Sequence, residues 1–378
     1  MARTAAEPAA LPEAERRTVV VKIGSSSLTT EAGQVDGDVI GRLAGEIAGL
    51  RRAGHRVVVV TSGAIAVGWA SLGSGGSRPN DPGVLQAVSA VGQPRLMRSW
   101  QDSLAEHGLV AGQVLLAPLD FMHRQQYLHA RGTFDHLLEL GVVPVVNEND
   151  AVADEEIRFG DNDRLAALVA HLVRADLLVL LTDTPGLLTA DPRRSDQASL
   201  IEEVVDIDHR LEEVAGGPGA VGSGGMASKL AAAKIAIWSG FPAVIADATR
   251  PGVLGDAVDG VPGVGTVFRP RDVRLSARKL WIAFALGARG RLVVDDGARR
   301  ALVLGGRSLL AAGVVSTGGR FEPDDAVEIA AADGAVFAKG LVRLRSDRAG
   351  EWVGRRTEDL PEDLAPEVVH RDDLVMLG

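Results

Sequence analysis

Short polar segments that follow apolar runs carry most of the residues able to do chemistry in this sequence. The run at 142–146 (VVPVV) ends in Asn147-Glu148-Asn149-Asp150, and a second polar group, Asp161-Asn162-Asp163, begins eleven residues after Asp150. Amides and carboxylates in such places bind polar small molecules, although Asn and Asp are also common in turns and at helix starts. The same arrangement recurs at three other apolar runs, which end in Lys22-Ile23-Gly24-Ser25, Thr61-Ser62-Gly63-Ala64 and Thr182-Asp183.

Two lysines lie where an anion is favoured. Lys22 sits in an otherwise apolar run, where an ammonium group is costly without an anionic partner. Lys229 lies in the first turn of a helix predicted at 226–239, where the helix dipole opposes a positive charge. It follows the glycine-rich stretch Gly222-Ser223-Gly224-Gly225-Met226-Ala227-Ser228. Glycine-rich backbone and helix N-termini both favour phosphate. The Gly-x-x-x-x-Gly-Lys-Ser/Thr loop is absent, so the pattern predicts another kind of phosphate site; the alternative is a solvated lysine on a surface loop.

The acidic residues of the two polar groups have several chemical options. Asp150, Asp161 and Asp163 are able to bind a divalent cation, to orient the lysines or to hold a substrate ammonium group. The spacings typical of zinc sites and the Gly-x-Ser-x-Gly motif of serine hydrolases are absent, and no residue is assigned as a metal ligand. Ser62 is therefore predicted to offer its hydroxyl and backbone N–H to a bound carboxylate rather than to act as a nucleophile.

Buried strands that alternate with helices must position these groups. Apolar runs predict strands at 18–23, 57–60, 114–117, 142–146, 177–181 and 243–246, and the longer segments between most of them predict helices. This alternation indicates an α/β domain with a mostly parallel sheet and helices on both faces. The carboxyl ends of parallel strands share one edge of the sheet, where open α/β sheets bind ligands. The four polar strand ends are therefore predicted to line one crevice.

The pattern changes near Pro270. A helix is predicted at 276–286, and from Arg291 onward short strands separated by turns indicate a small β-rich domain. The predicted organisation comprises a disordered N-terminal tail (1–17), the α/β domain (18–270), a linker (271–288), the β-rich domain (289–370) and a C-terminal tail (371–378).

Composition narrows the class of protein. None of the 378 residues is a cysteine, which excludes disulfides and thiolate chemistry and suits a reducing cytoplasm. The net charge of −10 argues against nucleic acid as the main partner. Residues 287–378 carry 13 Lys or Arg and 16 Asp or Glu, a net charge of −3, and lack a basic excess. No apolar stretch reaches the ~18 residues of a membrane span.

Together these motifs resemble the glutamate 5-kinases of the amino acid kinase superfamily. The strand-end lysine and Thr-Asp fit several superfamily members, whereas Asn-Glu-Asn-Asp, Gly-Asp-Asn-Asp and Gly-Gly-Met-x-Ser-Lys are more specific. The resemblance covers residues 18–375, and the β-rich region resembles a PUA domain. It implies an αβα sandwich around a mainly parallel eight-stranded sheet. Two small departures are Ser223 and Ser228, which stand where threonine is common but keep a hydroxyl.

The resemblance also implies an activity, which is ATP-dependent phosphorylation of the L-glutamate side-chain carboxylate (EC 2.7.2.11), the first step of proline biosynthesis. It implies Mg²⁺, feedback inhibition by proline, a homo-oligomer (a dimer or tetramer) and a cytoplasmic location. By resemblance, the catalytic residues are Lys22, Lys229 and Asp163, and glutamate is bound by Ser62, Asp150 and Asn162. The nucleotide would contact Lys22, Thr182, Asp183, Ser223, Gly224, Gly225, Met226, Ala227, Ser228 and Lys229.

A reaction of this kind needs no general base, because a glutamate side chain with a pKa of ~4.3 is already ionised near neutral pH. The lysines would stabilise charge on the moving phosphoryl group, and Asp150 is suited to the substrate ammonium. A kinase of the same superfamily with another acceptor, such as N-acetylglutamate, aspartate, carbamate or UMP, is one alternative. An RNA-binding or RNA-modifying protein is the other, since PUA domains are associated with RNA.

Overall fold

The computed structural model describes residues 15–73, 79–152, 162–190, 198–207, 211–212, 225–271, 274–359 and 367–377. The chain divides between Arg274 and Leu275 into two compact units. Most of the predicted N-terminal tail, residues 1–14, lies outside the described residues.

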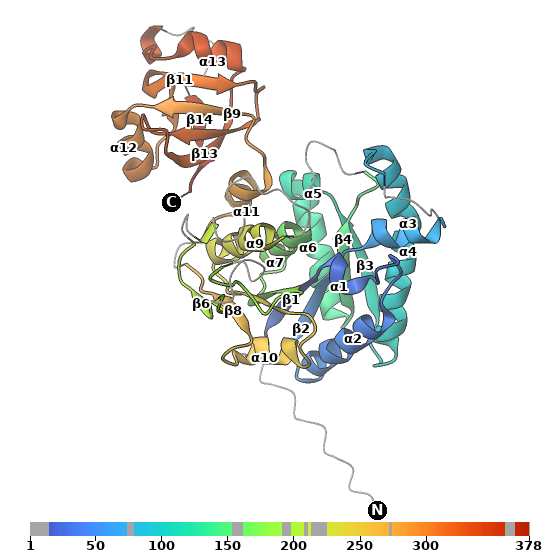
Figure 1. The fold of residues 1–378 in the computed structure, drawn as a ribbon. Helices are drawn as coiled ribbons and strands as arrows, with labels where there is room; N and C mark the ends of the chain where they lie inside the picture. The colour runs from blue at the N-terminus through green and yellow to red at the C-terminus, as the bar shows by residue number, and fades with distance from the viewer. Residues whose placement is uncertain are drawn as a thin grey trace, which may run out of the picture. The chain divides into compact units, whose positions relative to one another are not determined.

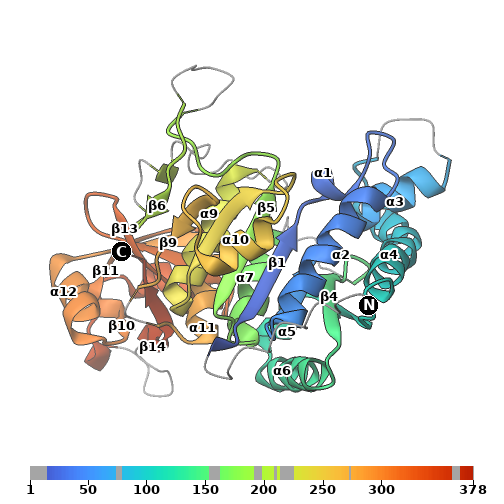
Figure 2. The same ribbon diagram turned by 90° about the horizontal axis from the view of Figure 1, so that it is seen from below.

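The first unit is an eight-stranded sheet with helices on both faces (Figures 1 and 2). The strand order is β3-β4-β2-β1-β5-β7-β8-β6, and neighbouring strands are parallel except for β7 and β8. This confirms the predicted α/β class and the mostly parallel sheet. The strands are β1 (Thr18–Ile23), β2 (Arg56–Val60), β3 (Ala111–Leu116), β4 (Val143–Glu148), β5 (Leu177–Thr182), β6 (Glu203–Val204), β7 (Ala243–Asp247) and β8 (Gly265–Phe268).

Helices cover the two faces of this sheet. Helices α2, α4 and α10 pack on one face, and α6, α7 and α9 pack on the other. Asp36 accepts a hydrogen bond from Val39 N and so caps α2, and Asp81 caps α4 in the same way through Val84 N. The helices of this unit are α1 (Ser25–Leu28), α2 (Gly37–Arg52), α3 (Ala64–Ser71), α4 (Pro82–Ala105), α5 (Pro118–Met122), α6 (Arg124–Glu139), α7 (Asn162–Leu172), α9 (Met226–Ser239) and α10 (Val253–Asp259).

Strand alternation decides which face receives the lysine of β1. Val19, Val21 and Ile23 are fully buried in the apolar core beneath α2, α4 and α10. Successive side chains of a strand point to opposite faces, so Lys22 points to the face that α7 and α9 cover. An ammonium group is thereby brought to the helices that begin at the carboxyl edge of the sheet.

Helices α3 and α4 touch backbone to backbone. A Cβ atom added at Gly92 would lie 1.8 Å from Ala64 O and 2.4 Å from Gly68 N, and one added at Gly68 would lie 2.0 Å from Val88 O. These atoms belong to main chain and are unable to rotate away. The two glycines therefore set how closely α4 approaches the start of α3.

Gly92→Ala is expected to lower the free energy of unfolding by about 3 kcal/mol, because the methyl group must push two helices apart. Chemical denaturation monitored by circular dichroism measures the change. Gly49→Ala in α2 is the matched control: its added Cβ meets nothing within 4 Å, so the free energy of unfolding should hold or rise by about 0.5–1 kcal/mol. Equal effects for the two substitutions would contradict the packing argument.

The second unit is a six-stranded sheet with order β10-β14-β13-β12-β9-β11. Its β-rich character confirms the prediction. Residues 371–376, predicted as part of a C-terminal tail, instead continue β14, whose Val375 pairs with Lys339 of β13. The elements are α11 (Ala277–Leu280), a π-helix (Trp281–Ala285), β9 (Gly290–Val294), α12 (Asp296–Gly305), β10 (Leu309–Leu310), a 3₁₀ turn (Ala311–Gly313), β11 (Val314–Gly319), β12 (Ala326–Ala330), β13 (Val336–Val342), α13 (Ser346–Trp352), a 3₁₀ turn (Thr357–Asp359) and β14 (Glu367–Met376).

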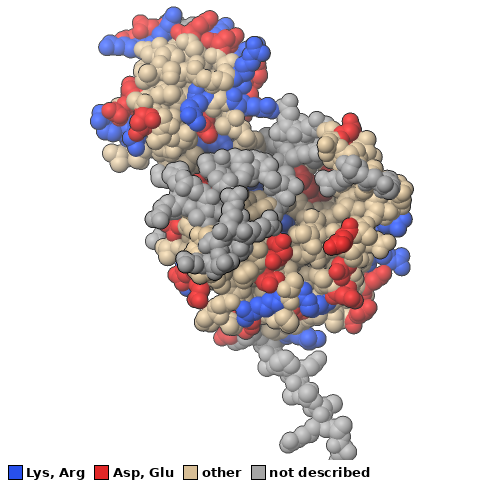
Figure 3. Space-filling view, in the orientation of Figure 1, with Lys and Arg blue, Asp and Glu red and all other residues tan. Residues whose placement is uncertain are grey.

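Basic and acidic side chains are interspersed over the second unit on the face that Figure 3 shows. Several pair with each other, as Arg291 does with Glu328 at 2.6 Å. Strong nucleic-acid sites present a continuous basic surface, and the described residues on this face do not form one. Within the described part of the chain, no helix combines the length and apolar character needed to cross a membrane.

Candidate active site

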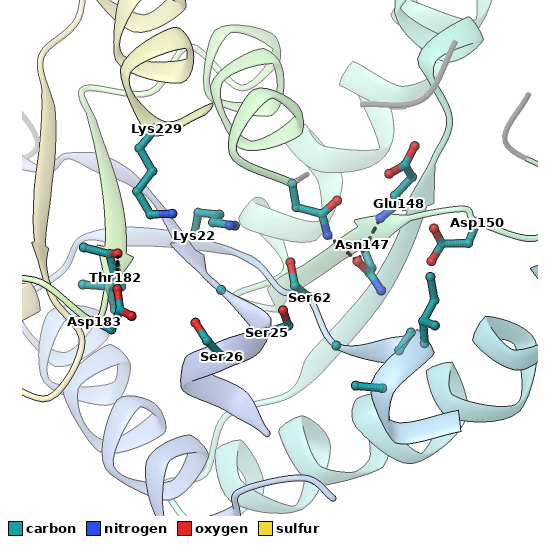
Figure 4. Close-up of a pocket in the computed structure, with 17 residues that line it drawn as sticks. Lys22, Ser25, Ser26, Ser62, Asn147, Glu148, Asp150, Thr182, Asp183 and Lys229 are labelled. Carbon is teal, nitrogen blue, oxygen red and sulfur yellow. Dashed lines mark hydrogen bonds between the residues drawn. The ribbon is translucent and has the colours of Figure 1, made fainter. Parts of the chain in front are cut away.

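A cavity of about 290 Å³ opens at the carboxyl ends of β1, β2, β4 and β5. The polar strand ends that were predicted to share one crevice are therefore together. Figure 4 shows Lys22, Lys229, Thr182 and Asp183 toward one end, Asn147, Glu148 and Asp150 toward the other, and Ser25, Ser26 and Ser62 between them. The lining residues are Lys22, Gly24, Ser25, Ser26, Ser62, Gly63, Ala64, Ile65, Ala66, Asn147, Glu148, Asp150, Asn162, Leu181, Thr182, Asp183 and Lys229.

One carboxylate holds both lysines at the first end. Lys22 Nζ lies 2.6 Å from Asp163 Oδ1, and Lys229 Nζ lies 3.3 Å from Asp163 Oδ2. Ser228 also donates a hydrogen bond to Asp163 Oδ2 at 2.7 Å. The three elements involved are β1 and the first turns of α7 and α9, and all three charged side chains are buried.

Electrostatics keep Asp163 ionised. Burial alone would raise the pKa of Asp163, but the charges of Lys22 and Lys229 more than offset that effect and hold the pKa below its usual value. Two ammonium groups and one carboxylate give the cluster a net charge of +1. A buried positive excess beside a cavity favours an anionic ligand.

Asp150 and three buried amides form the opposite end. Ser89 of α4 donates a hydrogen bond to Asp150 Oδ2 at 2.7 Å. Asn147 donates from Nδ2 to Gln93 Oε1 at 2.6 Å, and Asn162 donates from Nδ2 to Asn147 Oδ1 at 2.6 Å. A carboxylate next to neutral amides suits a ligand that carries a positive group at this end.

The start of α3, next to Ser62 in the chain, also lines the cavity. Gly63 precedes the helix with φ of +108°, a left-handed conformation that favours glycine. It supplies no side-chain cap, and the first turn of α3 has no acidic residue. Ala64, Ile65 and Ala66 line the cavity, so the helix dipole and the first backbone N–H groups favour a carboxylate there.

The cavity brings together Lys22, Ser62, Asp150, Asn162, Thr182, Asp183 and Lys229, all of which were site residues in the prediction. Asp163 lies behind the lysines and is fully buried. Gly225, Met226, Ala227 and Ser228 stand at the start of α9 but are not among the lining residues, while Ser223 and Gly224 lie outside the described residues.

Sequence reasoning missed the contribution of α4. Ser89, Gln93 and Trp100 hold Asp150, Asn147 and the Thr61 hydroxyl respectively, the last through Trp100 Nε1 at 3.0 Å. The available signal was weak: Ser89 and Gln93 are polar residues one turn apart on the helix face that carries the buried Leu85, Leu96 and Trp100.

Comparison with known proteins agrees with this geometry. Residues 17–247 match the model of the amino acid kinase family, and residues 290–362 match that of the PUA domain. The chain is 46% identical to a glutamate 5-kinase of Pelobacter propionicus, with 96% of this chain and 98% of that protein covered. It is 48% identical to one of Nocardia farcinica (96% and 97% covered) and 47% identical to one of Mycobacterium tuberculosis (96% and 95% covered). The resemblance of the whole chain to glutamate 5-kinases and that of its C-terminal region to a PUA domain are thus confirmed. The chain belongs to the glutamate 5-kinases of the amino acid kinase family.

Proposed function

We propose that the protein transfers the γ-phosphoryl group of ATP to the side-chain carboxylate of L-glutamate, giving L-glutamate 5-phosphate and ADP, the first step of proline biosynthesis. The observation that carries the proposal is the difference in charge between the two ends of the cavity. Two buried lysines on one carboxylate lie at one end, and Asp150 lies at the other. This arrangement complements phosphates at one end and an ammonium group at the other. The glutamate 5-kinase relatives support the same reading.

The acceptor end holds glutamate by its α-amino-acid group. Asp150 receives the ammonium, Ser62 and the first N–H groups of α3 receive the α-carboxylate, and Asn162 completes the wall. A charged hydrogen bond is about twice as strong as a neutral one, so Asp150 supplies most of the selectivity. N-acetylglutamate has no ammonium to offer and would lose this contact.

At the phosphate end, Lys22 and Lys229 would contact the β- and γ-phosphates, and Thr182, Asp183 and the stretch from Ser223 to Lys229 would surround the nucleotide. The cavity position of Lys22, Thr182, Asp183 and Lys229 supports this assignment. An oxygen of the ionised side-chain carboxylate attacks the γ-phosphorus, and the bond from that phosphorus to the β–γ bridging oxygen breaks. The electron pair leaves with ADP, and the lysines stabilise the charge on the transferring group. Mg²⁺ enters with ATP as part of the substrate and neutralises phosphate charge.

Three further properties accompany the proposal. Proline carries the same ammonium and carboxylate pair as glutamate, so we infer inhibition by proline through groups of the same chemistry. We infer a homo-oligomer, a dimer or tetramer, because β3 is an edge strand and Leu115 of this strand, Leu119 of α5 and Leu128 of α6 are partly exposed. A chain without cysteine suits the cytoplasm, where we place the enzyme.

A phosphorylation assay with L-glutamate, ATP and Mg²⁺ tests the proposal, with hydroxylamine present to trap the acyl phosphate as a hydroxamate. The expected result is hydroxamate and ADP in equal amounts. A coupled assay of ADP formation compares other acceptors. Little turnover is expected with N-acetylglutamate, aspartate, carbamate or UMP. A folded protein that forms no hydroxamate, or that prefers another acceptor, would overturn the assignment.

A further inference from the structure

Gln93 of α4 lies behind the residues that line the Asp150 end of the cavity. It is the first member of a series of buried hydrogen bonds. Gln93 is 8% exposed, Asn147 3% and Asn162 7%. Gln93 Oε1 accepts from Asn147 Nδ2 at 2.6 Å, and Asn147 Oδ1 accepts from Asn162 Nδ2 at 2.6 Å. The three amides thus form a relay from helix α4 to the cavity, which Asn162 lines.

Backbone groups fix the direction of this relay. The N–H of Glu148 donates to Asn147 Oδ1 at 3.0 Å, so the oxygen of that amide must face it and the nitrogen must face Gln93. Asn162 Nδ2 donates to the carbonyl oxygen of Thr61 at 2.6 Å as well as to Asn147 Oδ1. A backbone N–H only donates and a carbonyl only accepts. Reversing either amide would therefore bring two donors or two acceptors together.

The relay gives Asn162 a defined role. Its Nδ2 has two donor hydrogens, and Thr61 and Asn147 receive them. The amide atom left for a ligand is Oδ1, which accepts hydrogen bonds and complements an ammonium group rather than a carboxylate. Asp150 stands at the same end of the cavity, so the acceptor end presents a charged and a neutral acceptor together.

We propose that Gln93 is a positioning residue that holds the Asn147–Asn162 amides in this direction and thereby tunes the site for an acceptor with a free α-ammonium group. The inference rests on the proposed function and deepens it. Helix α4 is suited to the task, because Gly92, adjacent to Gln93, packs directly on α3, and Ser89 one turn earlier holds Asp150.

The test compares Gln93→Met, which keeps the size but removes the acceptor, with Gln93→Glu, which keeps an acceptor oxygen. Gln93→Met is expected to raise the KM for L-glutamate about tenfold, because a buried donor of Asn147 loses its partner. The KM for ATP and kcat should stay within about twofold, and Gln93→Glu should restore the glutamate KM to within about threefold of wild type. Gln101→Leu, at an exposed position of the same helix, is the control and should change nothing.

Glutarate separates positioning from general loosening, because it is glutamate without the ammonium group. Its competitive inhibition constant should be unchanged in Gln93→Met while the glutamate KM rises. A parallel rise in both constants and in the KM for ATP would overturn the proposal, as would an unchanged glutamate KM. If thermal unfolding shows that Gln93→Met is not folded, Gln93→Leu and Gln93→Glu are compared instead, with the same criteria. Wild-type protein without hydroxamate formation would refute the proposed function itself, whereas an active wild type with an insensitive Gln93 refutes only the relay.

Discussion

Asp163→Asn is expected to lower kcat about a thousandfold while leaving the KM for L-glutamate nearly unchanged. The substitution keeps the shape of the side chain but removes the charge that holds Lys22 and Lys229 at 2.6 and 3.3 Å. Each phosphate-stabilising group contributes about 100- to 1000-fold to the rate, and a displacement of about 1 Å costs about 100-fold. Steady-state kinetics of ADP release measure the effect, and Lys22→Ala and Lys229→Ala should likewise act mainly on kcat.

Ser228→Ala is the matched control, since it removes the hydrogen bond from an uncharged hydroxyl to the same Asp163 oxygen and leaves all three charges in place. Its kcat should fall no more than about tenfold. A kcat of Asp163→Asn within tenfold of wild type would show that the lysines position themselves without the carboxylate.

Asp163→Asn should also lower the free energy of unfolding by about 3 kcal/mol, because two buried ammonium groups lose their counter-charge. The pKa of Asp163 is lower in the folded protein than its ordinary 3.8. Its stabilising contribution is therefore complete above that ordinary value and is lost as pH falls through the lower folded pKa. Denaturation curves measured between neutral pH and acid should show that the variant lacks this part of the acid dependence.

Asp150→Ala is expected to raise the KM for L-glutamate about 100-fold, with kcat within about threefold of wild type. A charged pair at a partly buried site is worth about 2–5 kcal/mol, and the contact is made equally in the ground and transition states. Initial rates at saturating ATP over a wide range of glutamate concentrations give both constants. An unchanged glutamate KM would remove Asp150 from the acceptor site.

Ser89→Ala provides the graded comparison, because it removes the 2.7 Å hydrogen bond that orients Asp150 but keeps the carboxylate. The glutamate KM should rise only about fivefold. A rise as large as that of Asp150→Ala would mean that orientation, rather than charge, dominates the binding of the ammonium.

The sequence predicted those parts of the fold that rest on short-range patterns. The strand Thr18–Ile23 and the helix Met226–Ser239 occur at the predicted residues, because apolar runs bounded by glycine mark strand and helix ends clearly. The edge strand was harder: β3 begins at Ala111, three residues before the predicted start, since a half-exposed strand such as AGQVLL lacks a continuous apolar run. Within 200–205, only Glu203–Val204 forms a strand of the sheet, and Leu200 makes an isolated bridge with Leu188.

The candidate site shows the same division. Lys22, Asp150 and Lys229 stand beside strand ends or glycines, where their local sequence marks them as unusual. Gln93 lies 54 residues from Asn147. A glutamine in a helix could equally well face solvent, so only the tertiary packing identifies its partner. The different directions of Asn162 and Asp163 follow from the helix, because successive residues turn by about 100° and so reach opposite ends of the cavity.

The carboxylate of Asp163, which both lysines share, also affects the stability of the folded protein. Lys22, Asp163 and Lys229 together carry two positive charges and one negative charge in a buried place, where charge is costly. If the proposed nucleotide site is correct, the phosphates would add negative charge beside this cluster, and a ligand that binds only the folded chain raises the free energy of unfolding. At a concentration of 100 times its dissociation constant, a ligand of this kind adds about 2.7 kcal/mol to the free energy of unfolding. On the proposed function, the stability of the enzyme would therefore rise with the concentration of its own phosphoryl donor.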